Sequence, residues 1–130
     1  MYTNSTSESK SKNITLWILQ VLLALAFLAA GYGKLSGQPP MVTAFEQIGI
    51  GQWFRILTGG IEVIAAILLL VPRLIPIGAL ILSATMAGAV LTHVLVIGGS
   101  PVPALVLLVF TAIITWGRKN RIAALIGKSA

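Results

Sequence analysis

The sequence predicts an all-α integral membrane protein: a bundle of four membrane-spanning helices, with both termini cytoplasmic and a short interfacial helix in the first loop. Of its 130 residues, 57% are hydrophobic and only 9% are charged, whereas soluble domains carry roughly 25% charged residues. Four apolar stretches are separated by glycine, proline and basic residues. A chain of this length can form one such bundle and no second domain.

The N-terminal part of the chain divides into a polar tail and a first span. Residues 1–12 are rich in serine and threonine and lack periodicity, which predicts a disordered tail. Residues 13–117 are expected to form a single transmembrane domain, and its first span, 14–32, can cross a hydrocarbon core of about 30 Å. A cleavable secretory signal is the alternative, since Lys10 and Lys12 precede this run. Its apolar core is longer than the ~7–15 residues that are usual in such signals.

The loop after the first span, residues 33–52, is too long to be structureless in a compact unit. Pro39-Pro40 suits the first turn of a helix, and the apolar residues that follow recur at helical spacing up to Gly49. We therefore expect a short helix here, lying in the membrane interface with its apolar face toward the lipid.

Three further apolar stretches complete the predicted bundle. They cover residues 53–71, 75–97 and 102–116. Pro72 stops the first of them, and the sequence GGSP (98–101) separates the other two, because glycine and proline interrupt helices.

The basic residues indicate the orientation of the bundle. Residues 118–130 form a basic segment that we expect to lie on the lipid headgroups as an amphipathic end. Four spans place both termini on one side of the membrane, and that side collects most of the basic residues: Lys10, Lys12, Arg73, Arg118, Lys119, Arg121 and Lys128, against Lys34 and Arg55 on the other. The positive-inside rule then places both termini in the cytoplasm. The expected location is a bacterial-type inner membrane, and the expected partners are anionic membrane lipids, with no nucleic acid.

Glu62 needs an explanation, because an ionised side chain near the centre of a spanning helix costs at least ~2.5–3.5 kcal/mol. The second and third spans are antiparallel neighbours joined by a short turn, so residues equidistant from that turn lie at similar depth. Arg55 is then level with His93 near the outer face, together with Lys34 from the end of the first span. Glu62 lies about 10 Å deeper, level with Met86.

Helical spacing also puts these residues on facing stripes of the two helices. We therefore predict an outward-facing polar pocket, with Glu62 as its floor and the cationic side chains at its mouth. Glu62 is expected to contact Arg55 directly and to reach His93 only through a water or a ligand. The candidate pocket residues are Lys34, Arg55, Thr58, Glu62, Met86 and His93.

Each of these residues also has a structural interpretation, and the sequence leaves both open. Glu62 can pair with Arg55 simply to lock two helices together, His93 can be an interhelical hydrogen-bond donor, and Lys34 can extend to the headgroups. Gln20 is expected to hydrogen-bond between helices, away from this cluster. Small residues, Gly59-Gly60 among them, predict where helix backbones approach closely.

Signatures of self-contained catalysis are missing from the sequence. It contains no cysteine, one histidine and three acids, with no useful metal-ligand spacing, so no metal is expected. It also lacks a nucleophile with a suitably placed base and a phosphate-binding loop.

The polar candidates lie in or beside four segments: AGYGKLSG (30–37), FEQIGI (45–50), RILTGGIEVIAAILLL (55–70) and MAGAVLTHVLV (86–96). Together these segments resemble the DoxX-like family of small four-helix membrane proteins, over about residues 14–116. The polar positions that recur in that family fall here on Lys34, Arg55, Glu62 and His93.

The resemblance implies a redox partner, because the family takes its name from an association with a thiosulfate:quinone oxidoreductase. The chain would then be a subunit or partner of a quinone-linked membrane redox system, with quinone as a non-covalent cofactor and electrons from a soluble or membrane oxidoreductase. The alternative is a non-catalytic membrane scaffold or assembly factor. A transporter is less favoured, because the chain has no inverted repeat. The sequence leaves open the ligand, any enzymatic activity and assembly into a homo-oligomer.

Overall fold

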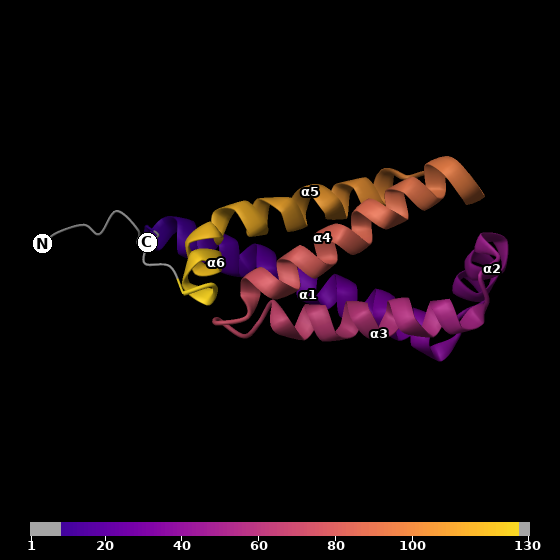
Figure 1. Ribbon diagram of the computed structural model, residues 1–130, viewed down its shortest axis with the longest axis horizontal. Coiled ribbons are helices and arrows are strands. Elements are labelled where there is room, and N and C mark those ends of the chain that lie inside the picture. The colour runs from indigo at the N-terminus through magenta and orange to yellow at the C-terminus, as the bar shows by residue number, and fades with distance from the viewer. Residues whose placement is uncertain (1–8, 128–130) are drawn as a thin grey trace, which may run out of the picture.

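The computed structural model describes residues 9–127, and every regular element within this range is a helix (Figure 1). The all-α prediction is therefore confirmed. The elements in chain order are α1 (Lys10–Ser36), α2 (Pro39–Ile48), α3 (Gln52–Leu68), α4 (Ile75–Thr92), the π-helix η1 (His93–Ile97), α5 (Val102–Gly117) and α6 (Lys119–Leu125).

The first helix is longer than the predicted span at both ends. Its N-cap is Ser9, whose hydroxyl accepts a hydrogen bond from the Lys12 backbone N–H at 3.0 Å. Its C-cap is Gly37, which has the left-handed φ of 74° that favours glycine. The predicted disordered tail is thus wrong for Lys10–Lys12, which belong to α1, while residues 1–8 lie outside the described residues.

The short helix expected in the first loop is present as α2. It starts at Pro39-Pro40 and ends at Gly49, which has a left-handed φ of 84°. The following helix, α3, leaves at an angle of 118° to α2. Because proline suits a first helical turn and glycine a left-handed C-cap, both boundaries could be predicted from the sequence.

The helices form two antiparallel pairs, with α1 beside α3 and α4 beside α5 (Figure 1). The pairs lie together at the end that holds α6 and the start of α1, where α3 turns into α4. They diverge toward the other end, where α2 contacts η1. The shared core lies between the pairs and contains large apolar side chains such as Phe27, Leu69, Ile75, Leu82 and Ile114.

Three glycines allow the helix backbones to approach closely. A Cβ atom at Gly31 would lie 2.6 Å from Val63 Cγ2, and one at Gly59 would lie 2.9 Å from Lys34 Cβ. A Cβ atom at Gly78 would lie 2.7 Å from the Ala65 carbonyl oxygen. The first two glycines set the contact between α1 and α3, and the third sets the contact between α3 and α4. By contrast, Gly60 has open space where its Cβ would be.

The helix that begins with α4 changes from α-helical to π-helical winding before it ends. The run from Ile75 is α-helical to Thr92 and continues as a π-helix from His93 to Ile97. Single π-turns are rare and are often found at functional sites. The sequence does not anticipate this change, which begins at its single histidine.

The outer surface of the helices is apolar. Two helical runs, Lys10–Ser36 and Ile75–Ile97, are long and apolar enough to cross a membrane, and up to four spans result if each bent helix pair counts as one. Large apolar side chains such as Leu22, Leu25 and Ile64 are about 60% exposed. A surface of this kind requires lipid rather than water as its solvent.

Candidate functional site

Glu62 lies inside the bundle and forms an ion pair with a lysine of another helix. Its side chain on α3 is 1% exposed, and its Oε1 is 2.9 Å from the Nζ of Lys34 on α1, whose side chain is 14% exposed. An ionised group placed at this depth is stable only with a partner. The pair therefore explains how the bundle accommodates the carboxylate.

The close contact of α1 with α3 positions this ion pair. Gly59, three residues before Glu62, lies against the stem of Lys34, where any larger residue would collide with the lysine Cβ. Since residues three apart share a face of a helix, Gly59 and Glu62 both face α1. The long side chain of Lys34 then reaches along α3 to the carboxylate.

Arg55 does not contact Glu62, so the predicted direct contact is wrong. Its Nη1 donates a hydrogen bond to the backbone carbonyl of Lys34, and its Nε donates to Gln52 Oε1 at 2.7 Å. The last carbonyls of a helix lack intrahelical donors, and a cation is favourable near them. Arg55 therefore caps the C-terminal end of α1, which leaves Lys34 as the partner of the carboxylate.

The other candidate residues have partners away from the Lys34–Glu62 pair. The Thr58 hydroxyl donates to the Phe54 carbonyl at 2.8 Å, and Met86, 5% exposed, belongs to the apolar core. His93 Nδ1 is 2.9 Å from the Gly98 carbonyl oxygen. Because a carbonyl only accepts hydrogen bonds, Nδ1 carries the proton in this contact.

Three of the six predicted residues thus come together, but the partner of Glu62 is Lys34 and not Arg55 as predicted. Lys34, Arg55 and Glu62 form one connected group at the α1–α3 contact. No hydrogen bond or ion pair links His93 to Glu62 in the part of the chain that the structure describes. The outward-facing pocket as a whole stays a prediction.

A second buried polar cluster lies at the opposite end of the bundle, and most of it could not be predicted from the sequence. The guanidinium of Arg118 is fully buried, with Nε donating to Gln20 Oε1 at 2.8 Å and Nη1 donating to Asn13 Oδ1 at 2.7 Å. Gln20 Nε2 in turn donates to the Leu69 carbonyl at 2.9 Å. The interhelical role expected for Gln20 is confirmed.

The burial of Arg118 contradicts its predicted place on the headgroups. The chain bends by 62° between α5 and α6, and at this bend Arg118 turns into the bundle instead of outward. Its guanidinium lies 5.8 Å from the centre of the Trp17 ring, a favourable cation–π distance. A basic residue at the end of an apolar stretch looks the same in sequence whether its side chain turns in or out. The only related signal was Gln20, a polar residue in mid-span that needs a partner.

Within residues 9–127, no group of three or more His, Cys, Asp or Glu side chains is placed to hold a metal ion.

The fold and its internal polar pairs define the class: an all-α membrane protein in which ionisable side chains are buried between helices. The chain belongs to the DoxX-like family, whose pattern matches residues 18–117. The resemblance seen in the sequence is thereby confirmed. Comparisons with curated proteins and with solved structures gave no match.

Proposed function

We propose that the protein is a subunit or partner of a quinone-linked membrane redox system, and that Glu62 is its proton-exchanging group. The buried Lys34–Glu62 ion pair is the observation that carries this proposal. Ionisable residues inside spanning segments are rare and mark proton relays and ligand sites more often than chance.

The donor set around the pair suits the two carbonyl oxygens of a quinone headgroup. Lys34 Nζ can donate a hydrogen bond to one oxygen, and Glu62 can hold or release a proton beside it. His93 belongs to the π-helix that contacts α2, and with its Nδ1 donating to the Gly98 carbonyl its Nε2 could accept a hydrogen bond from a hydroxyl of the reduced, quinol form. A bound quinone would supply the two-electron, two-proton chemistry, and an oxidoreductase partner would supply the electrons.

A short-chain quinone is expected to raise the melting temperature of the purified wild-type protein in detergent. A ligand at 100 times its Kd stabilises a protein by about 2.7 kcal/mol. The shift should be much smaller for His93→Ala, and unchanged for Thr92→Ala, whose hydroxyl only bonds the Gly88 carbonyl of its own helix. Absence of a shift in the wild type would contradict the quinone proposal.

A membrane scaffold or assembly factor is the second candidate function. The contact made by Arg55 favours it. The Arg55 guanidinium joins α3 to α1 through the Lys34 carbonyl, which is a structural role and not a ligand-binding one. Mass spectrometry of the protein purified from its native membrane distinguishes the two. A co-purifying quinone supports the redox function, whereas a partner protein with no lipophilic ligand supports the scaffold.

We also propose four spans with both termini cytoplasmic, in a bacterial-type inner membrane. This orientation is supported by the basic residues near α6 and the start of α1, which lie at one end of the bundle (Figure 1). The chain contains no cysteine, so single introduced cysteines report topology. An impermeant thiol reagent added outside intact cells should label Ser100→Cys and leave Ser11→Cys unlabelled until the membrane is opened. The reverse pattern would invert the orientation.

A further inference from the structure

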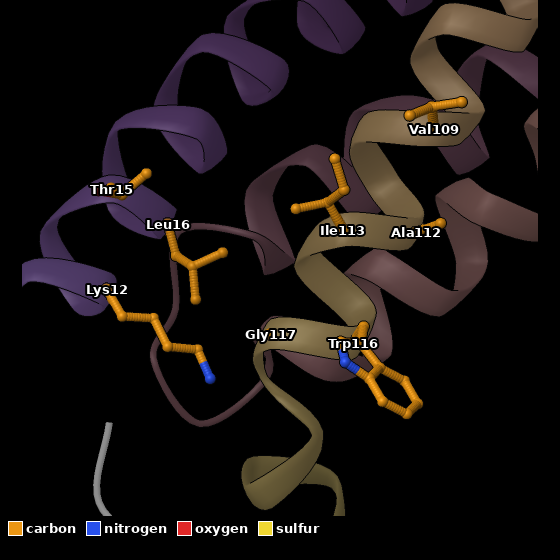
Figure 2. A pocket seen from close by; sticks show the side chains of 8 residues that line it. All are labelled: Lys12, Thr15, Leu16, Val109, Ala112, Ile113, Trp116 and Gly117. Carbon is orange, nitrogen blue, oxygen red and sulfur yellow. The ribbon is translucent and has the colours of Figure 1, made fainter. Parts of the chain in front are cut away.

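A groove runs along the outside of the bundle between the first turns of α1 and the last turns of α5 (Figure 2). Its volume of about 670 Å³ is within the ~300–1,000 Å³ usual for small-molecule sites. It lies at the opposite end of α1 from Lys34. This groove is independent of the function proposed above.

The floor and walls of the groove are apolar. Leu16, 5% exposed, closes the floor against Gly117, where a Cβ atom would lie 2.9 Å from the leucine methyl groups. Val109 and Ile113 line the α5 side and remain 50% and 46% exposed. The helices therefore meet closely at Leu16 and Gly117, and the apolar wall on α5 stays exposed.

One end of the groove is cationic. The side chain of Lys12 extends from α1 toward the end of α5 that carries Gly117 and Trp116 (Figure 2). Its ammonium makes no hydrogen bond or ion pair with any residue from 9 to 127. Beside this end, Lys119 Nζ lies 4.3 Å from the centre of the exposed Trp116 ring.

The carboxylates of the described chain lie far from this end. Glu46 is on α2 and Glu62 is on α3, toward the other end of the bundle. No acid among residues 9–127 therefore neutralises Lys12.

The direction of the groove matches the depth profile of a lipid leaflet. From Trp116 to Val109 the α5 wall rises about 10 Å along the helix axis, well within one leaflet of a ~30 Å hydrocarbon core. Tryptophan and lysine favour the headgroup level, and valine and isoleucine the hydrocarbon. The groove thus leads from charged headgroups into acyl chains.

We propose that this groove is a binding site for one anionic phospholipid. Its phosphate binds Lys12 at the Trp116 end of the groove, with Lys119 near the Trp116 ring adding positive charge, and one acyl chain lies along Val109 and Ile113. Basic sites next to spanning helices recognise anionic headgroups in this way. A second copy of the chain is disfavoured as the occupant. In a dimer with its two-fold axis along the membrane normal, residues at the same depth face each other, so the two Lys12 side chains would lie together and repel.

The test is lipid binding to the purified protein by native mass spectrometry and by melting temperature, with phosphatidylglycerol and phosphatidylcholine of identical acyl chains. Phosphatidylglycerol should bind more tightly and stabilise the protein more. Lys12→Gln should weaken its binding about fivefold, equivalent to the ~1 kcal/mol of one lysine near an anionic surface. The matched control Lys10→Gln removes an exposed charge outside the groove and should change binding by less than about twofold.

A second pair of variants tests the apolar part. Ala112→Leu fills the groove and should weaken binding of both lipids, whereas Ala26→Leu, on an exposed face of α1, should leave it unchanged. Equal losses for Lys10→Gln and Lys12→Gln, or equal binding of the two lipids, would overturn the proposal. So would a wild-type dimer that Ala112→Leu dissociates, because the occupant would then be a second copy.

Discussion

Replacing Glu62 with leucine is expected to destabilise the folded protein by about 3–5 kcal/mol, the range seen when one member of a buried ion pair is removed. Lys34 would keep its ammonium beside an apolar side chain, and its 14% exposure gives it little solvent. Unfolding of the purified protein in a denaturing detergent titration would measure the loss.

Two further variants separate the ion pair from the simple loss of a side chain. Glu62→Gln keeps an acceptor for Lys34 Nζ and should cost less than Glu62→Leu. The double variant Lys34→Met with Glu62→Leu should recover most of the stability, because an apolar pair of similar volume often replaces a buried ion pair at little cost.

Arg55 is the competing partner for Glu62, so it gives the sharpest test of the Lys34–Glu62 pairing. A double-mutant cycle should show strong coupling of Glu62 with Lys34 and weak coupling with Arg55, whose guanidinium binds the α1 carbonyl instead. Stronger coupling of Glu62 with Arg55 would restore the pairing predicted from sequence and refute the one in the structure.

The double variant also bears on function. If it folds and still shows the quinone-dependent rise in melting temperature, the ion pair is not needed for quinone binding and acts as a structural contact. If it folds and loses the shift, the pair takes part in ligand binding. The comparison is informative because stability and ligand response are measured on the same protein.

Helix positions could be predicted from the sequence because lipid leaves the backbone few choices. A spanning segment must satisfy its own N–H and C=O groups, so a long apolar stretch is a helix. Proline and glycine then fix the ends, as Pro39-Pro40 and Gly49 do for α2. Extension of α1 to Lys10 was missed, because its first turn depends on the cap formed by Ser9.

The partner of Glu62 could not be predicted in the same way. Depth along the helices placed both Lys34 and Arg55 near the outer face, and depth alone does not say which helix faces the acid. The decision rests on Gly31 and Gly59, which bring α1 against the Glu62 face of α3. Of these, only Gly59 was recognised as a residue that favours close approach.

Replacing Arg118 with alanine is expected to destabilise the protein by about 3–5 kcal/mol. The substitution removes a large, fully buried side chain and leaves a cavity. It also leaves Gln20 Oε1 and Asn13 Oδ1 without the guanidinium donors, and an unsatisfied buried acceptor costs about 1–3 kcal/mol. The same unfolding titration measures the effect.

The neighbouring lysine is the matched control for Arg118. If both basic residues lay on the headgroups, as the sequence predicts, Arg118→Ala and Lys119→Ala would have similar small effects, because surface substitutions usually change stability by less than about 0.5 kcal/mol. The structure predicts a large loss for Arg118→Ala alone, since Lys119 is exposed and only covers the Trp116 ring. Gln20→Leu should also be strongly harmful, because it removes the acceptor of the buried Arg118 Nε and leaves the Leu69 carbonyl without the Gln20 donor. Similar stabilities for the Arg118 and Lys119 variants would show that the arginine side chain lies outside the bundle. A large loss in both the Arg118 and Gln20 variants, with strong coupling in their double mutant, would establish the hydrogen-bonded contact that joins α1, the end of α3 and the α5–α6 bend.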